Sequence, residues 1–210
     1  MSRIKQIAVA ASKFSFATAL ALALAAGAEA SATTLENLQA AYNGESNANA
    51  RYLAFADKAQ SEGYGEVASL FRAAARAEKI HATNHAAVIE KMGALPKAQI
   101  ETPLVKSTRE NLEAAVKGET YERDTMYPDF LKQARVDRNT RAVRTFNLAK
   151  SAEAEHAKLY AAALANLDHL KGTQEAAYYV CPVCGYTTRE AKFTRCPSCF
   201  TSRDAFEKVV

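Results

Sequence analysis

Apolar residues recur at helical spacing in two stretches of the first half of the chain. One stretch runs from Thr34 to Ser61 and the other from Val67 to Met92, and in both the apolar residues return every three or four positions. Because residues at this spacing share one face of a helix, each stretch predicts a long amphipathic helix. The Gly-containing segment between them, residues 61–65, predicts a short turn, so the two helices should run antiparallel.

The second half of the chain repeats this arrangement. Residues 93–106 contain two prolines and are too long for a tight turn, so they predict a crossover connection. A third helix is expected from Ser107 or Thr108 to about Arg135, and a fourth from about Arg138 to Leu170. The pattern therefore predicts an all-α four-helix bundle over residues 31–170.

The first thirty residues follow a different pattern. Three basic residues precede an apolar run, and Ala28-Glu29-Ala30 forms a cleavage site of the small-x-small type. These features are typical of a secretory signal peptide, and the apolar run is too short to span a membrane comfortably. Residues 1–30 are therefore predicted to direct export to the periplasm and to be removed, which leaves no integral membrane span in the mature chain. A retained leader on a cytoplasmic protein is the alternative.

Composition separates the helical body from a small C-terminal unit. The chain has 210 residues, 49% of them hydrophobic, which is enough for one buried helical core and a second, smaller unit. All four cysteines follow residue 180, so we expect a linker over residues 171–178 and a cysteine-containing domain over residues 179–210. The net charge of +4 is scattered without a basic run, and no nucleic-acid partner is expected.

Two Glu-x-x-His pairs stand at equivalent places in the two predicted hairpins. Each pair lies 33 or 34 residues after a Gly-Glu dipeptide, and the midpoints of these spans fall in the predicted turns. The side chains should therefore meet at one level of the bundle, where they match the ligand set of dinuclear sites in ferritin-like bundles. Carboxylate and imidazole ligands suit iron or manganese, and the glutamates of the two pairs are best placed to bridge both metals. The residues of this set are Glu45, Glu78, His81, Glu119, Glu153 and His156.

Equivalent residues of the two halves lie 75 positions apart, with one exception. Phe71 matches Phe146 at this offset, as do the Glu-x-x-His pairs, whereas the two leading glutamates differ by 74 positions. The third helix must therefore accommodate one additional residue. We predict a π-helical insertion near Glu122 to Tyr127, because single-residue insertions of this kind occur within helices at functional sites.

A fifth carboxylate, Glu122, lies three residues after Glu119 on the same expected face. With this extra glutamate and the second histidine, the chain resembles the rubrerythrins from about Leu35 to Val210. The resemblance implies a di-iron centre in which Glu122 and His81 are alternative ligands to one iron, the glutamate in the oxidised state and the histidine in the reduced state. Exchanging a carboxylate for a neutral imidazole would suit the lower charge of two ferrous ions.

Three further residues lie near the expected ligands. Tyr52 and Tyr127 follow the leading glutamates at similar spacing. Core packing is one interpretation of these tyrosines, and the resemblance suggests instead that they donate hydrogen bonds to the metal-binding carboxylates. His85 lies one helical turn beyond His81, where we expect it to pack beside the site rather than bind metal.

Two Cys-x-x-Cys motifs, separated by eleven residues, define the C-terminal domain. Two such motifs predict a tetrahedral thiolate site for one metal ion rather than disulfides. Spacing leaves iron and zinc open, whereas the resemblance to the rubredoxin-like domain of rubrerythrins favours one iron ion, with zinc as the alternative. The cysteines are Cys181, Cys184, Cys196 and Cys199.

The resemblance implies a non-haem di-iron peroxidase, an oxidoreductase that protects against oxidative stress. Hydrogen peroxide would be reduced to water at the carboxylate site, whose seven side chains would be catalytic, and electrons would return through the cysteine-bound iron. An external electron-donor protein or reductase would supply them, since the chain has no Gly-rich dinucleotide motif. The resemblance also implies a head-to-tail homodimer.

Two other functions fit parts of the sequence. A ferroxidase or other iron-handling protein would use the same carboxylate site, but it leaves the cysteine-rich tail unexplained. A metal-binding module without turnover would carry zinc in its tail and show no redox response.

Overall fold

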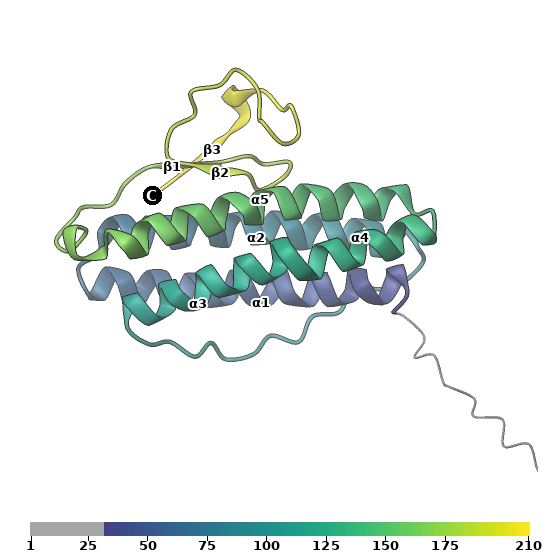
Figure 1. Cartoon of the computed structure of the whole chain (residues 1–210), viewed down its shortest axis with the longest axis horizontal. Coiled ribbons are helices and arrows are strands. Elements are labelled where there is room, and N and C mark those ends of the chain that lie inside the picture. Colours follow the sequence, from purple (N-terminus) through teal and green to yellow (C-terminus); the bar gives the residue numbers. More distant parts are fainter. Residues whose placement is uncertain (1–31) are drawn as a thin grey trace, which may run out of the picture. The chain divides into compact units, whose positions relative to one another are not determined.

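The computed structural model of the protein describes residues 32–210 (Figure 1). Two antiparallel helices form its first hairpin. Helix α1 spans Thr34–Ser61 and α2 spans Gly65–Lys91. The turn between them places Gly63 at a φ of 78°, a backbone conformation that residues with a side chain rarely adopt. The predicted signal peptide, residues 1–30, lies outside the described residues.

The second hairpin contains a π-helical segment. Helix α3 spans Thr108–Tyr121, the π-helix η1 spans Glu122–Met126, α4 spans Tyr127–Val136 and α5 spans Thr140–Ala165. The π-helical insertion predicted from the unequal offsets is therefore confirmed. Because a π turn holds more residues than an α turn, the leading glutamate and the residues after η1 can face the same interior.

The crossover connection predicted over residues 93–106 joins the two hairpins, and it runs along α1 (Figure 1). The backbone amide of Gln99 donates to Oδ1 of Asn43 at 2.7 Å, and that of Glu101 donates to Oδ1 of Asn47 at 2.9 Å. These side chains supply acceptors to a segment that has no helix or strand of its own.

The first residue of each hairpin is hydrogen-bonded to an acidic residue in the turn of the other hairpin. The hydroxyl of Thr34, the first residue of α1, donates to Asp137 at 2.7 Å, and the hydroxyl of Thr108, the first residue of α3, donates to Glu62 at 2.6 Å. Each acid also accepts the backbone amide of the same threonine. These equivalent contacts fix the relative height of the hairpins, and hence the level at which their glutamates meet.

The core is divided into two hydrophobic clusters, one around Phe71 and one around Phe146. Each buried phenylalanine stabilises the fold by about 1.5–3 kcal/mol. On α1, Ala41 belongs to the second cluster and Ala48 to the first, so Glu45 is buried between two apolar regions. A carboxylate in such a place requires partners.

The fourth helix is shorter than predicted. Helix α5 ends at Ala165, and the short 3-10 helix η2, Leu167–His169, follows, whereas we expected one helix to Leu170. The apolar spacing continues past Ala165, but the side-chain amide of Asn166 donates to the carbonyl of Ala162 at 2.9 Å. Asparagine side chains that bond to nearby backbone in this way favour helix ends over helix interiors.

A small antiparallel sheet forms the C-terminal domain. Its strands are β1 (Tyr178–Val180), β2 (Thr187–Thr188) and β3 (Glu207–Val209), in the order β2-β1-β3, and the 3-10 helix η3 spans Arg203–Ala205. The predicted class, a helical bundle followed by a small four-cysteine domain, is confirmed.

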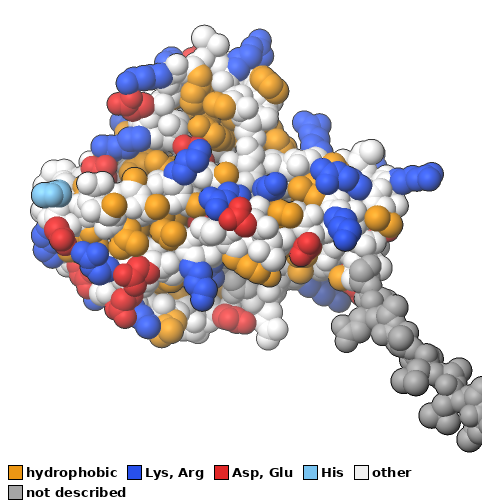
Figure 2. Space-filling view, in the orientation of Figure 1, with side chains coloured by type: hydrophobic (Ala, Val, Ile, Leu, Met, Phe, Trp, Pro, Cys, Tyr) orange, Lys and Arg blue, Asp and Glu red, His pale blue; other side chains and the backbone are white. Residues whose placement is uncertain are grey.

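The described surface mixes charges of both signs on the face shown in Figure 2. Among the helices of residues 32–210, none is both long and apolar enough to cross a membrane.

Candidate metal centre

Six of the predicted ligand side chains converge inside the bundle, and none is more than 1% exposed. Helices α1 and α3 each contribute one glutamate, and α2 and α5 each contribute a Glu-x-x-His pair whose members share one helical face. The glutamates of α1 and α3 are Glu45 and Glu119; the pairs are Glu78 with His81 and Glu153 with His156.

The six side chains form two overlapping groups of four. Within each group, one ligand atom from every member lies within 4.8 Å of the others. Glu78 and Glu153 belong to both groups, so each can place a carboxylate oxygen in either one, as a bridging ligand must. The groups are Glu45, Glu78, His81 and Glu153, and Glu78, Glu119, Glu153 and His156.

Six buried atoms of these residues lack a hydrogen bond of acceptable geometry. Buried polar atoms normally have partners, and leaving one unsatisfied costs about 1–3 kcal/mol. Two cations at the centres of the groups would satisfy these atoms together, so the residues fit a dinuclear metal site. The atoms are Oε2 of Glu45 and Glu119, Oε1 of Glu78, both carboxylate oxygens of Glu153 and Nδ1 of His156.

The C-terminal domain fixes the orientation of His81. Nε2 of His81 lies 3.0 Å from the carbonyl oxygen of Cys184, which can only accept, so Nε2 carries a proton and donates it. Nδ1 then faces the pocket, 2.9 Å from Glu78 Oε2 and 3.0 Å from Glu153 Oε1. Nδ1 is therefore the nitrogen available to a metal.

His156 is oriented in the same way. The hydroxyl of Thr187 donates to the carbonyl of Gly185 at 2.9 Å, so its oxygen accepts from Nε2 of His156 at 3.1 Å. Nδ1 of His156 lies 3.0 Å from Glu153 Oε2 and 3.2 Å from Glu78 Oε1. Both histidines thus point Nδ1 at the bridging glutamates because the tail holds Nε2.

Burial and mutual repulsion shift the pKa values of the metal-free carboxylates. Burial, with the charges of Glu78 and Glu153, raises the pKa of Glu45 well above its usual range. Burial, followed by the charge of Glu78, raises the pKa of Glu119 to about 8. Without cations the pocket therefore retains protons that metal ions would displace.

The pKa values of the two ligand histidines are also raised, but by the neighbouring glutamates rather than by burial. Burial alone would lower the pKa of His81, but the charge of Glu153 and the hydrogen bonds to Glu153, Glu45 and Glu78 together raise it. Glu78, Glu119 and Glu153 together do the same for His156. Burial would raise the pKa of Glu78, yet its two histidine neighbours lower it. The imidazoles and carboxylates therefore neutralise one another in the metal-free protein.

Both tyrosines singled out from the sequence donate to the leading glutamates. The hydroxyl of Tyr52 donates to Glu119 Oε1 at 2.6 Å, and that of Tyr127 donates to Glu45 Oε1. Each tyrosine thus bonds one carboxylate oxygen and leaves Oε2 of the same glutamate free to face the pocket.

Glu122 lies beside the two groups but belongs to neither. It is the first residue of η1 and is half-buried. Burial, then the charges of Glu45 and Glu119, raises its pKa well above the usual range, so its carboxylate lies within electrostatic reach of the pocket. In this arrangement His81, not Glu122, completes the first group.

His85 is buried and lies outside both groups, as expected. Its Nε2 lies 3.1 Å from the Tyr127 hydroxyl, and its Nδ1 lies 3.1 Å from Oγ1 of Thr145. Burial, followed by the charge of His81, lowers the pKa of His85 to about 3, so the imidazole is neutral.

The four cysteines of the tail cluster as free thiols. Their sulfur atoms all lie within 4.8 Å of one another, with Sγ of Cys181 and Cys199 3.5 Å apart and Sγ of Cys184 and Cys196 3.6 Å apart. These separations far exceed the roughly 2.05 Å of a disulfide bond. The arrangement fits four thiolate ligands around one metal ion.

Ionisation of the thiols is uneven without a metal. A hydrogen bond from Cys184, the leading cause, lowers the pKa of Cys181 to about 5, whereas burial raises the pKa of Cys196 to about 11. A cation at the centre would remove this difference, because it stabilises every thiolate that binds it.

Comparison with known proteins places this geometry in a family. The rubrerythrin family profile matches residues 36–164. Nigerythrin from Nitratidesulfovibrio vulgaris is 40% identical over 175 residues, 83% of this chain and 85% of that protein. Rubrerythrin-2 from Clostridium acetobutylicum is 37% identical over 179 residues, 84% of this chain and 97% of that protein. The chain belongs to the rubrerythrin family.

Solved structures agree with the sequence relatives. The fully reduced, all-ferrous state of nigerythrin superimposes with a TM-score of 0.79 at 37% identity, covering 88% of this chain and 91% of that one. A bacterioferritin from Desulfovibrio desulfuricans, with a TM-score of 0.63 at 23% identity over 68% of this chain and 89% of that one, shares the fold of the bundle.

In this rubrerythrin the C-terminal domain is fastened to the bundle of its own chain. Arg76 on α2 makes two hydrogen bonds to Glu207 on β3, at 2.6 and 2.8 Å. Gly185, at a φ of 74°, passes so close to the site that an added Cβ would lie 2.3 Å from Nε2 of His81. The contact between the two metal sites therefore forms within one chain, and the head-to-tail dimer stays a prediction.

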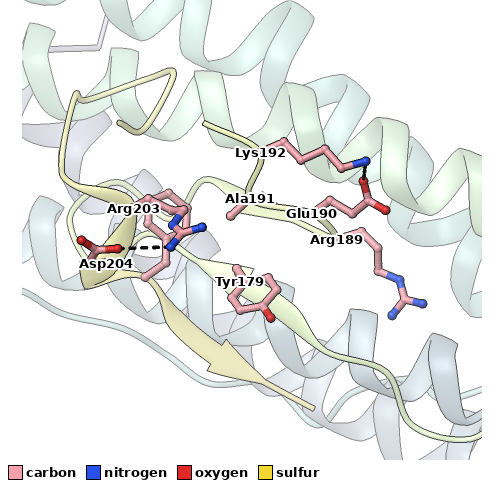
Figure 3. A pocket seen from close by; sticks show the side chains of 8 residues that line it. Tyr179, Arg189, Glu190, Ala191, Lys192, Arg203 and Asp204 are labelled. Atoms are coloured by element: carbon pink, nitrogen blue, oxygen red, sulfur yellow. Dashed lines mark hydrogen bonds and ion pairs between the residues drawn. The ribbon is translucent and has the colours of Figure 1, made fainter. Parts of the chain in front are cut away.

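A surface cavity of the described residues lies apart from this centre. It has a volume of about 650 Å³ and is lined in the tail by Tyr179 and by charged side chains (Figure 3). Its charges are paired locally, Lys192 with Glu190 and Arg203 with Asp204. Since none of the predicted ligands lines this cavity, it is not the candidate centre.

Sequence reasoning missed Thr145 and Thr187. Thr187 follows the first cysteine motif, and its contact with His156 depends on how the tail docks, which no local pattern reveals. Thr145 had a signal: it aligns at the 75-residue offset with Leu70, and a hydroxyl replacing a core leucine indicates a buried polar partner.

Proposed function

We propose that this rubrerythrin is a non-haem di-iron peroxidase that reduces hydrogen peroxide to water and regains electrons through one iron ion bound by its four cysteines. The observation that carries the proposal is the position of His81, whose Nδ1 faces the carboxylate pocket while Nε2 bonds to the Cys184 carbonyl. Two iron ions in the pocket would supply two electrons and hold both oxygen atoms of the peroxide.

The types of ligand atom support iron in the carboxylate pocket and in the four-cysteine site. Carboxylates with one imidazole per metal suit iron or manganese, and four thiolates suit iron or zinc. The nigerythrin that this chain resembles is described as all ferrous in its reduced state. An external protein or reductase would reduce the tail.

His81 joins the two sites. The path from Cys184 to the pocket consists of one carbonyl, one 3.0 Å hydrogen bond and one imidazole ring. An oxidised pocket and a reduced tail would thus be connected without an intervening solvent gap, since His81 and Cys184 are both buried.

Glu122 is proposed as the alternative ligand to His81. Its place at the start of η1, close to the pocket but outside both groups, fits a carboxylate that enters when the charge of the metals rises. The π-helical turn supports this role, because its backbone bonds are less regular than those of an α-helix.

Absorption spectroscopy tests the function as a whole. The iron-loaded full-length protein should show a red ferric-thiolate band that is lost on anaerobic reduction and restored by hydrogen peroxide. A colourless tail that contains zinc, or a band that peroxide does not restore, would contradict the peroxidase and favour a metal-binding module or a ferroxidase.

The variant Glu122→Ala tests the exchange of ligands. Peroxide turnover should fall at least about 10-fold, since one state of the centre loses a ligand, while the iron content should stay near that of the parent protein. Stopped-flow kinetics and iron analysis measure the two quantities. The matched control is Glu113→Ala, an exposed glutamate of α3. Equal turnover in Glu122→Ala and Glu113→Ala would rule the exchange out.

A further inference from the structure

A buried chain of hydrogen bonds leads away from the metal pocket. Oε1 of Glu45 accepts from the Tyr127 hydroxyl, the Tyr127 oxygen lies 3.1 Å from Nε2 of His85, and Nδ1 of His85 lies 3.1 Å from Oγ1 of Thr145. The first three of these side chains are at most 1% exposed and Thr145 is 6% exposed. We call Thr145, His85, Tyr127 and Glu45 the relay path.

The carboxylate sets the direction of every bond in this path. Tyr127 donates its proton to Oε1 of Glu45, so the Tyr127 oxygen is free to accept from Nε2–H of His85. With its proton on Nε2, His85 accepts at Nδ1 from the Thr145 hydroxyl. Three successive donors therefore point from Thr145 toward the pocket.

The outer end of the path reaches the surface. Thr145 lines a cavity of about 360 Å³ between α2 and α5, together with Lys91, Arg141 and Arg144. This cavity is large enough to hold several water molecules, which would supply protons at Thr145. At the inner end, Oε1 of Glu45 is bonded to Tyr127 while Oε2 faces the pocket without a hydrogen bond.

We propose that the relay path delivers the protons consumed at the metal pocket, with His85 as its central positioning and proton-passing residue. This inference rests on the proposed peroxidase function, in which hydrogen peroxide, two electrons from the two ferrous ions and two protons give two molecules of water. His85 takes a proton at Nδ1 from Thr145 as it gives one from Nε2 to Tyr127. Tyr127 passes its own proton to Oε1 of Glu45, which releases it to the peroxide oxygen being reduced, while Thr145 regains a proton from water in the cavity. Each group then has its original number of protons, and His85 returns to the Nε2-protonated tautomer before it passes the next proton.

The other half of the bundle begins an equivalent path. Tyr52 donates to Oε1 of Glu119 at 2.6 Å, as Tyr127 does to Glu45. The position equivalent to the relay histidine, 75 residues further along the chain, is Tyr160. Its hydroxyl is fully buried and has no hydrogen-bond partner within residues 32–210.

This second path is interrupted. The residue equivalent to Thr145 is Leu70, a core residue of the same hydrophobic cluster as Tyr160. A leucine can neither donate nor accept, so no hydrogen bond leads from Tyr160 toward the surface at that position. The duplication has thus kept a proton path in one half only, and Tyr160 offers a matched control.

Single-turnover kinetics test the relay in the iron-loaded full-length protein. His85→Gln keeps a donor for Tyr127 but cannot pass a proton through its amide, and Thr145→Val removes the hydroxyl at nearly constant volume. Both variants should slow the oxidation of the reduced protein by peroxide, on the order of 100-fold for His85→Gln, and change its solvent deuterium isotope effect. Thr145→Ser should restore both quantities, and Tyr160→Phe should leave them unchanged.

A spectroscopic readout separates this inference from the proposed function. In the zinc-loaded full-length protein, nitrogen NMR should show His85 as the Nε2-protonated tautomer, and Thr145→Val but not Thr145→Ser should shift its Nδ1 resonance. An Nδ1-protonated His85, or parent-like rates and isotope effects in both His85→Gln and Thr145→Val, would overturn the relay. If peroxide does not oxidise the parent protein at all, the peroxidase proposal fails, and the tautomer of His85 still decides whether the path has the required direction.

Discussion

At the scale of single residues, the least expected feature is that the tail orients both ligand histidines. A carbonyl holds Nε2 of His81 and a threonine hydroxyl holds Nε2 of His156, so Nδ1 of each ring faces the bridging glutamates. Groups that orient metal-binding histidines typically contribute 10-fold to 100-fold in metal affinity.

Thr187→Val should therefore weaken metal binding in the bundle. The valine keeps the volume of the side chain but cannot accept from His156, so the affinity of the pocket is expected to fall about 10-fold to 100-fold. Competition with a chelator, followed by iron analysis, measures the change. Thr188→Val, at the neighbouring position of β2, is the control and should bind like the parent. Parent-like affinity in Thr187→Val would show that Thr187 does not orient the ring.

The sequence predicted the residues that meet in the pocket better than the residues that hold them. The Glu-x-x-His pairs are recognisable because residues three apart on a helix share a face, and the duplication places them at one level. The partner of Nε2 in His81 is the carbonyl of Cys184, 103 residues farther along the chain. The partner of Nε2 in His156 is Thr187, 31 residues farther along. No periodicity encodes such contacts, because they depend on tertiary docking.

At the scale of secondary structure, the π-helix η1 accommodates the one additional residue of the second half of the bundle. The leading glutamates are offset by 74 residues and the later core residues by 75, so a regular helix could not direct both Glu119 and Tyr127 inward. That single mismatch was enough to predict the segment. The end of α5 was predicted five residues too late, because apolar spacing continues after the side chain of Asn166 has ended the helix.

Deleting Thr125, an exposed residue of η1, should convert the π turn into an α turn. Glu119 and Tyr127 would then be seven residues apart in a regular helix, as Glu45 and Tyr52 are in α1, so both should still face the interior. We expect the bundle to keep its iron and its stability, whereas peroxide turnover should fall about 10-fold, because the π turn that begins at Glu122 is lost. The tail should keep its metal.

Iron analysis, chemical denaturation and stopped-flow kinetics of the deletion variant check this expectation, with Thr125→Ala as the control of unchanged length. A deletion variant that turns over peroxide as fast as Thr125→Ala would show that η1 is dispensable.

At the scale of the whole molecule, the bundle and the tail act as one unit in the described structure. The Arg76 to Glu207 hydrogen bonds and the close approach of Gly185 to His81 bring the four-cysteine cluster against the carboxylate pocket. The two domains were predictable from composition and motifs, whereas their contact was not. The head-to-tail homodimer that the resemblance implies stays a prediction, and within one chain the tail contacts its own bundle.

Anomalous diffraction from crystals of the iron-loaded protein, recorded at the iron and zinc absorption edges, tests the central claim most directly. Two iron peaks about 3.5–4 Å apart should lie between Glu78 and Glu153, and a third should lie among the four cysteine sulfurs. A bundle with one iron peak or none, or a tail whose signal appears only at the zinc edge, would contradict the account.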